Sequence, residues 1–205
     1  MNGNILENTE EGMFLGVLID KKLTFSSHID YISNKISKSI GILFKLSSLK
    51  IPKTILTHIY YCLIQSYLNY NICVYLGTFD THINRLLLLQ KRAIRLVSGA
   101  GFLDHTEPLF HSNKILKIND MYKLNVGLYM FDRVGTGDYD RDHQYNTRNR
   151  NDLLPRRSRL TVTQNSLASI GPNIWNSIPE NIKNSLTRSS FKCQYKKYLL
   201  SLYDN

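Results

Sequence analysis

The sequence has few cysteines, and the three it has, Cys62, Cys73 and Cys193, are far apart along its 205 residues. This spacing matches neither a disulfide framework nor a zinc-binding motif, so neither kind of cross-link is expected. Cys62 and Cys73 stand among apolar residues, and we expect both to be buried thiols in a reducing compartment. Apolar residues make up 42% of the chain, which is enough to form a hydrophobic core.

The sequence also lacks an apolar run long enough to span a membrane. Its first residues, "MNGNILENTEEG", are polar and acidic, unlike a signal or transit peptide. We therefore expect a soluble intracellular protein of the nucleus or cytoplasm that is not secreted and has no membrane partner.

Residue patterns that carry catalysis are absent as well. The sequence has no glycine-rich phosphate loop with a lysine, and no pair of aspartates at the end of a strand that would hold two magnesium ions. The six histidines do not have the spacing of metal ligands. Asp138 and Asp140 stand in a glycine-rich segment without flanking strands. We predict no catalytic residues, no metal site, no cofactor and no small-molecule substrate.

Acidic residues are scarce relative to basic ones, 16 against 26, which gives the chain a net charge of +10. Such a balance favours a polyanionic partner, because a basic protein gains free energy by releasing counterions from phosphates. Most of the bases lie in residues 21–100 and 141–205, on either side of a mildly acidic segment, 101–140. This distribution indicates two contact surfaces.

Helical periodicity dominates what the sequence does contain. Apolar residues at steps of three and four, with capping residues at the ends, predict helices over these segments: Ser26 or Ser27 to about Phe44, Pro52 to Leu68, Asp80 to Gly99, Asn119 or Asp120 to Arg133, and Ser189 or Ser190 to Leu202. Residues 13–19 predict a buried strand with a turn after it and with its sheet partners outside the chain. Residues 161–163 and 167–170 are possible strands. The expected fold is mainly α, a helical bundle preceded by a short β element, with a small α+β or irregular C-terminal unit.

Two basic segments are candidates for binding phosphates. Arg85, Lys91, Arg92 and Arg95 lie on neighbouring faces of one predicted helix, without the alternating acids of an intrahelical ion-pair ladder. The segment "HQYNTRNRNDLLPRRSRL", residues 143–160, cannot form a helix because Pro155 interrupts it. Arginine matches phosphate oxygens through its planar fork. Both segments have a second interpretation, as solvated surface, and Trp175 downstream is expected to lie in the core.

Several segments, in order, carry a family resemblance. "MFLGVLIDKKLTFSSHIDYISNKISKSIGIL" resembles a strand of the type Phe/Tyr-Leu-Gly-Val-x-Ile-Asp followed by a Leu-x-aromatic-x-x-His-Ile turn. "LIQSYLNYNICVYLGT", "LLLLQKRAIRLVSGAGFLDHTEPLF", "YNTRNRNDLLPRRSRL" and "GPNIWNSIPENIKNSLTRSSFKCQYKKYLL" follow. Together they resemble the thumb and C-terminal region of reverse transcriptases from jockey-like retrotransposons without long terminal repeats. The match covers nearly the whole chain, although "VYLG" at 74–77 lacks the tryptophan expected there.

The resemblance implies a domain organisation. Residues 1–24 would be a remnant strand region that follows a polymerase palm, and residues 25–100 a thumb-like three-helix bundle. Residues 101–140 would be a helical connector, and residues 141–205 a basic C-terminal unit ending in a helix. The family's catalytic aspartates precede the Phe-Leu-Gly strand and are missing here. The implied function is that of a nucleic-acid-binding fragment of an RNA-directed DNA polymerase that lacks the catalytic palm.

The resemblance and the charge pattern together suggest site residues and partners. Phe14, Leu15 and Gly16 would lie near the primer end. The candidates for contact with RNA or an RNA–DNA hybrid are Lys35, Lys38, Arg85, Lys91, Arg92, Arg95, Arg148, Arg150, Arg156, Arg157 and Arg159. Two alternatives stay open: a protein-interaction module without nucleic-acid binding, and a piece that completes a polymerase palm fragment supplied in trans.

Overall fold

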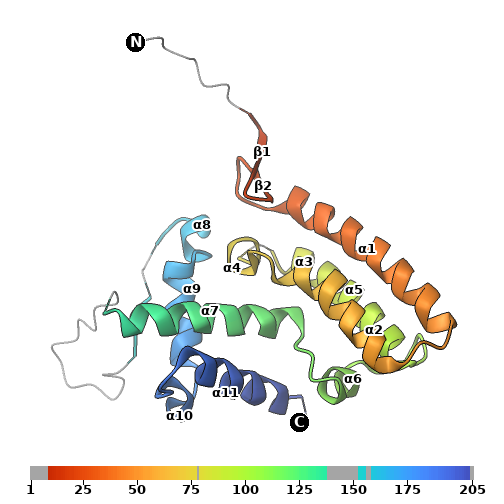
Figure 1. Cartoon of the computed structure of the whole chain (residues 1–205). Helices are drawn as coiled ribbons and strands as arrows, with labels where there is room; N and C mark the ends of the chain where they lie inside the picture. The colour runs from red at the N-terminus through yellow and green to blue at the C-terminus, as the bar shows by residue number, and fades with distance from the viewer. Residues whose placement is uncertain (1–8, 78, 138–151, 156–157, 204–205) are drawn as a thin grey trace.

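The computed structural model describes residues 9–77, 79–137, 152–155 and 158–203, and these residues are mostly helical (Figure 1). The elements are β1 (Glu11–Phe14), β2 (Val17–Asp20), α1 (Ser26–Ser48), α2 (Lys53–Tyr60), the π-helical turn η1 (Tyr61–Gln65), α3 (Ser66–Asn69), α4 (Ile72–Tyr75), α5 (Asp80–Ser98), α6 (Glu107–Ser112), α7 (Ile118–Gly135), α8 (Thr161–Gln164), α9 (Leu167–Asn176), α10 (Glu180–Lys183) and α11 (Arg188–Ser201). The predicted mainly α fold with a short N-terminal β element is confirmed.

The first half of the chain forms a bundle of α1, the continuous α2–η1–α3 segment and α5. The apolar stripe predicted on α1 is buried along Ile29, Ile32, Ile36 and Ile40, as steps of three and four residues require. Phe44 departs from this pattern, because its side chain is 58% exposed. Gly99 ends α5 with a φ of 64°, the left-handed conformation that glycine adopts at helix ends, as predicted.

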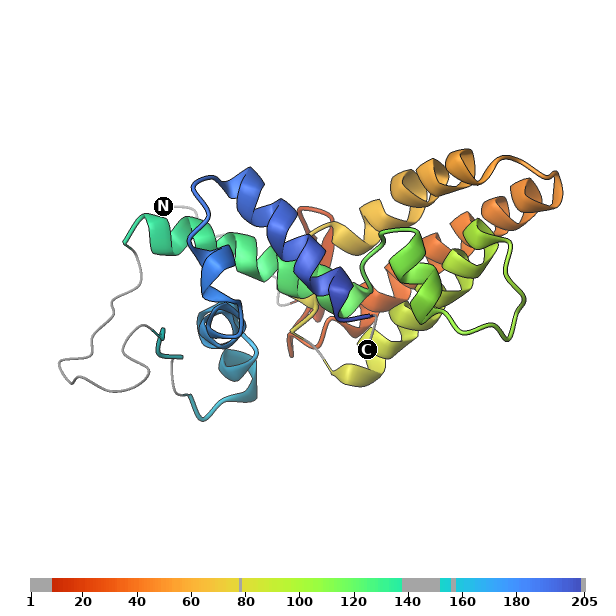
Figure 2. The ribbon, with the colours of Figure 1, turned by 90° about the horizontal axis from the view of Figure 1, so that it is seen from below.

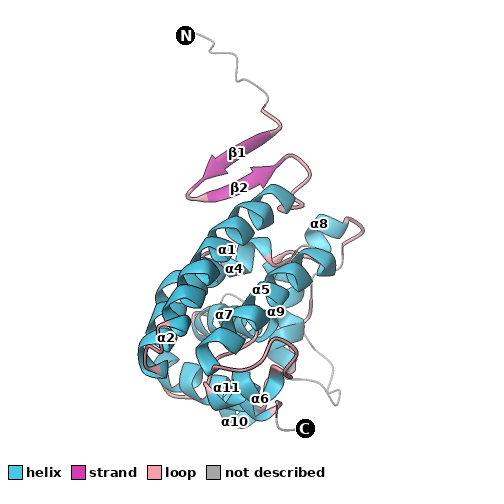
Figure 3. Cartoon of the chain, turned by 90° about the vertical axis from the view of Figure 1, so that its right-hand side faces the viewer, coloured by secondary structure: helices cyan, strands magenta, loops and turns pink. Residues whose placement is uncertain are grey.

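The predicted N-terminal strand is wrong in detail, because the segment folds back on itself. β1 and β2 pair antiparallel, with Phe14 opposite Val17, and the hairpin lies over the N-terminal end of α1 (Figure 3). The turn falls at Leu15 and Gly16, not after Asp20. Both turn residues have positive φ, 45° and 77°, as a two-residue hairpin turn requires. Leucine rarely adopts such a φ, so this turn has no clear signature in the sequence. The strand's partner lies within the chain, and β1 is exposed.

Asp20 joins the hairpin to α1. Its carboxylate accepts hydrogen bonds from the backbone N–H of Phe25 at 2.7 Å and from the N–H and hydroxyl of Thr24, both at 3.0 Å. Phe25, with a φ of 56°, is the residue that precedes the first helical turn. The predicted capping by Ser26 or Ser27 is therefore wrong, since Asp20 binds the chain just before the helix begins.

We expect Asp20→Ala to lower the free energy of unfolding by about 1 kcal/mol at neutral pH, the usual cost of removing such an acceptor. Burial acts to raise the pKa of Asp20, but the hydrogen bonds from Thr24 and Phe25 outweigh it and hold the pKa below 3.8. The contribution is therefore complete above about pH 4 and is lost as the pH falls through the lowered pKa of the folded state. Urea unfolding over a pH series tests this. A difference between variant and wild type that persists at about pH 2 contradicts it.

The C-terminal unit is helical in its described residues, and the expected strands at 161–163 and 167–170 are wrong. These residues belong to α8 and α9, and Pro172 lies inside α9 instead of forming a turn. Short apolar runs do not distinguish strand from helix by periodicity, and here packing decides. Trp175 is buried, as predicted, and stacks on Phe191 of α11 with ring centroids 5.9 Å apart.

α7 connects the two halves of the fold. It contacts α3, α4 and α5 of the bundle, and it also packs on α9 and α11 (Figure 2). Buried apolar residues from α1 through α11 belong to one hydrophobic cluster. The position of α11 on α7 therefore determines which side chains from the two halves meet.

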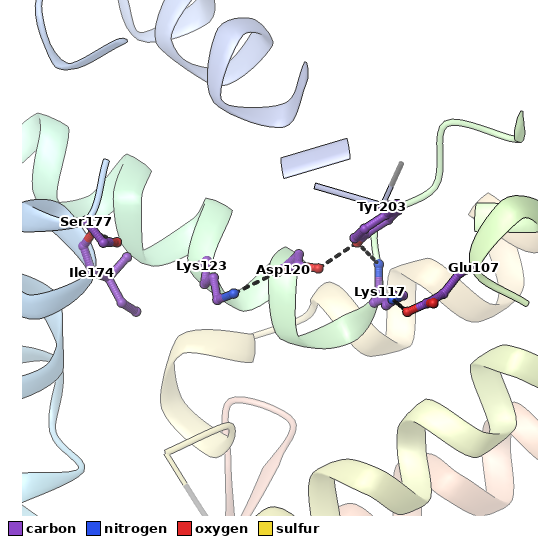
Figure 4. A network of polar contacts seen from close by, with 7 residues as sticks. All are labelled: Glu107, Lys117, Asp120, Lys123, Ile174, Ser177 and Tyr203. Atoms are coloured by element: carbon purple, nitrogen blue, oxygen red, sulfur yellow. Dashed lines mark hydrogen bonds and ion pairs between the residues drawn. The ribbon is translucent and has the colours of Figure 1, made fainter. Parts of the chain in front are cut away.

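The end of the chain is fastened to the first turn of α7 (Figure 4). The hydroxyl of Tyr203 donates to Oδ2 of Asp120 at 2.6 Å and accepts from the backbone N–H of Lys117 at 3.0 Å. The ammonium of Lys117 lies 4.4 Å from the centroid of the Tyr203 ring and also pairs with Glu107. α11 begins at Arg188, after Thr187, whose hydroxyl accepts from the N–H of Ser190, so the predicted serine cap is wrong.

Two expectations drawn from composition have different outcomes. Cys62 is exposed, contrary to prediction, because it lies on the outer side of η1. Cys73 is half-buried, and burial raises the pKa of its thiol to about 11. None of the helices in the described ranges combines the length and apolar character needed to cross a membrane.

Candidate nucleic-acid interface

The basic surface predicted on α5 is partly engaged within the chain. Arg85 pairs with Asp30 of α1, and Nε of Arg95 donates to the carbonyl oxygen of Asp104 at 3.0 Å. The side chain of Arg85 is still 51% exposed, and exposed ion pairs contribute little to stability. Arg92 is exposed, forms no ion pair with any described residue, and lies on the same side of α5 two turns further on. This side of α5 is therefore open to a phosphate backbone.

The other predicted contact residues of the bundle are accessible to different degrees. Lys91 on α5 is half-buried. Lys35 on α1 is also half-buried, and its ammonium lies 5.4 Å from the centroid of the Tyr31 ring. Lys38, about one turn further along α1, is exposed. Of these three lysines, Lys38 presents its charge most freely.

Most of the predicted arginine segment lies outside the described residues, namely Arg148, Arg150, Arg156 and Arg157. Arg159 is described and exposed. Between them, Leu153 is buried and fixed to α9, because the side-chain amide of Asn176 exchanges two hydrogen bonds of 2.9 Å with its backbone. One part of the segment is thus anchored on the C-terminal unit.

The residues predicted to lie near a primer end form the tip of the hairpin. Phe14 and Leu15 are 65% and 72% exposed. The hydroxyl of Tyr70 donates to the carbonyl oxygen of Leu15 at 2.7 Å. A Cβ on Gly16 would lie 3.3 Å from Cε1 of Tyr70, so the turn needs glycine both for its φ and for this close packing. The structure brings the "FLG" segment and the "YLNY" segment together.

A pocket of about 420 Å³ lies beneath this turn, with Tyr31, Tyr67 and Tyr70 among its walls. His28 also lines it, and its Nδ1 accepts from the backbone N–H of Leu18 at 3.4 Å. Burial lowers the pKa of His28, so the imidazole is neutral at neutral pH. The histidine of the "SSHI" segment thus links β2 to α1.

The sequence analysis missed a cluster of lysines at the junction of the two halves. Lys192 and Lys196 stand one turn apart on α11, and Lys114 approaches them from the segment between α6 and α7. None of the three forms an ion pair with a described residue. Their spacing on α11 is visible in the sequence, but the approach of Lys114 follows only from the tertiary fold.

Comparison with known proteins connects this surface to a family. The RNA-directed DNA polymerase from mobile element jockey of Drosophila funebris is 32% identical over 124 residues, which are 58% of this chain and 13% of that protein. The protein of the same description from Drosophila melanogaster is 27% identical over 135 residues, 63% of this chain and 14% of its own length. The probable RNA-directed DNA polymerase from transposon X-element of Drosophila melanogaster is 27% identical over 111 residues, 52% of this chain and 12% of that protein.

The chain is therefore homologous to a region of the RNA-directed DNA polymerases of retrotransposons without long terminal repeats, as its sequence motifs indicated. It matches only 12% to 14% of the length of these relatives. No family model matches the chain, and no solved structure is similar to it.

Proposed function

We propose that the chain is the thumb and C-terminal region of an RNA-directed DNA polymerase and that it binds RNA or an RNA–DNA hybrid. The observation that carries this proposal is its homology to the jockey polymerases. In this proposal residues 25–100 form the thumb, residues 101–140 connect it to the C-terminal unit of residues 141–205, and residues 1–24 adjoin a palm. The chemical step depends on aspartates of that palm, and these 205 residues contribute the grip on the nucleic acid.

The proposed grip is a set of phosphate contacts. A thumb holds a template–primer duplex through its backbone, for which exposed basic side chains on helices are suited. Arg85 and Arg92 on α5 and Lys38 on α1 are the described candidates with the most accessible charge. Arg148, Arg150, Arg156, Arg157 and Arg159 form the proposed second contact, to template RNA.

The test is binding of a fluorescent RNA–DNA hybrid to the purified chain over a salt series. We expect the logarithm of the association constant to fall linearly with that of the salt concentration, by about 0.9 for each phosphate contact. Arg85→Gln combined with Arg92→Gln should make this dependence shallower. The control is Lys45→Gln combined with Lys50→Gln, which removes the same charge from the opposite end of α1. A folded chain that fails to bind at low salt refutes the proposal.

The hairpin tip favours a second function, the completion of a palm supplied by another segment or chain. Met13, Phe14 and Leu15 are all more than 60% exposed, and such an apolar strand end suits a protein surface. Primer extension on mixing with a palm fragment of a related polymerase tests this, and Phe14→Ser should reduce it. Association with protein that is insensitive to salt, without nucleic-acid binding, would instead favour an interaction module.

A further inference from the structure

A small pocket lies where α3, α7 and α11 meet. Its volume is about 200 Å³. Its floor is apolar, made of Leu116, Met121, Leu124 and Leu128. The bundle side contributes Gln65 and Asn69, and α11 contributes Lys192 and Lys196. The pocket therefore exists only because α7 brings the two halves of the fold together.

The polar wall of the pocket offers hydrogen-bonding groups. The amide nitrogen of Asn125 donates to Oδ1 of Asn69 at 2.9 Å and to the carbonyl oxygen of Met121 at 2.7 Å, which fixes both asparagines. Oε1 of Gln65 is buried and has no hydrogen-bond partner in the described part of the chain. A buried acceptor of this kind is costly unless a donor reaches it. The wall is thus suited to a ligand that carries an N–H or O–H group.

The lysines at the rim repel one another. Burial is the main cause that lowers the pKa of Lys196, and the charges of Lys192 and Lys114 lower it further. Exposed lysines normally separate or pair with acids, yet none of these three has an acidic partner among the described residues. An anion at the rim would relieve this repulsion, and a phosphate group carries the required charge.

We propose that this pocket holds one unpaired nucleotide of a bound RNA strand, with its phosphate on Lys192 and Lys196 and a donor of its base or ribose on Oε1 of Gln65. This inference rests on the proposed nucleic-acid-binding function and adds a site to it. Pockets for drug-sized ligands measure roughly 300 to 1,000 Å³, so this one has room for a single ring on its apolar floor and excludes a duplex. All four bases and the 2′-hydroxyl carry donors, so the pocket accepts any sequence.

The experiment measures binding of a fluorescent single-stranded uridine octamer to the full chain over a salt series. Lys192→Gln with Lys196→Gln is compared with Lys45→Gln with Lys197→Gln, which removes equal charge and includes an exposed lysine of the same helix that does not line the pocket. We expect the first pair to weaken binding about tenfold more than the second and to lower the salt dependence by about 0.7 for each phosphate that the variant no longer binds. Gln65→Leu should weaken binding about fivefold and leave the salt dependence unchanged.

Two modified octamers identify the donor. If a base meets Gln65, Gln65→Leu has no effect on an abasic strand; if the ribose does, it has no effect on a deoxyribose strand. Equal reductions of affinity in the two lysine pairs, with salt-dependent binding by the wild type, overturn the pocket and leave the proposed function standing. An unchanged affinity in Gln65→Leu also overturns the pocket. Absence of binding by the folded wild type overturns both, and thermal unfolding of each variant confirms that it is folded.

Discussion

Replacement of Gln90 by leucine is expected to lower the free energy of unfolding by about 4 kcal/mol. Gln90 is fully buried in α5. Its amide nitrogen donates to the hydroxyl of Tyr60 and to the carbonyl oxygen of Leu116, both at 2.9 Å. Its amide oxygen accepts from the backbone N–H of Ile118 at 2.9 Å. One side chain thus joins α2, α5 and the start of α7.

Leucine would occupy most of the same volume but leave all three partners buried and unpaired, each at a cost of about 1 to 3 kcal/mol. Urea denaturation followed by circular dichroism measures the decrease. Gln194→Leu, the same substitution at an exposed position of α11, is the control and should change the free energy by no more than about 0.5 kcal/mol. A decrease below about 1 kcal/mol in Gln90→Leu means that these three groups find water or other partners, and contradicts the assignment.

The bundle helices were predictable because their burial is periodic. Ile29, Ile32 and Ile36 mark one face of α1, and Gly99 marks the end of α5. The hairpin was not predictable, because its turn depends on a left-handed Leu15 that only the contact of Tyr70 with its carbonyl group makes favourable. α9 was mistaken for a strand, because Pro172 argues against a helix locally and packing on α7 prevails.

The candidate interface was predictable as a set of charges, and only the fold shows which charges are engaged. The pairing of Arg85 with Asp30 joins residues on different helices, so no local pattern indicates it. The same holds for the pocket, since Gln65, Asn125 and Lys196 come from three separate elements. Family motifs located the thumb-like region, because they record such long-range contacts without stating their geometry.

Gly127→Ala is expected to lower the free energy of unfolding by about 2 kcal/mol, although alanine favours a helix over glycine by about 1 kcal/mol. Gly127 lies in α7 where α11 crosses it. An added Cβ would lie 2.8 Å from Cε1 of Tyr195 and 3.3 Å from Cδ1 of Ile178. Tyr195 is itself only 2% exposed, so its ring has no room to move away.

Gly41→Ala on α1 is the matched control, because Gly41 is exposed and an added Cβ there meets nothing within 4 Å. It should raise the free energy of unfolding by about 0.5 to 1 kcal/mol, through helix propensity alone. Urea denaturation should therefore give opposite signs for the same substitution in two helices. If both variants are stabilised, α11 does not sit against α7 at Gly127. In that case the pocket formed by Lys192 and Lys196 with α7 loses its structural basis.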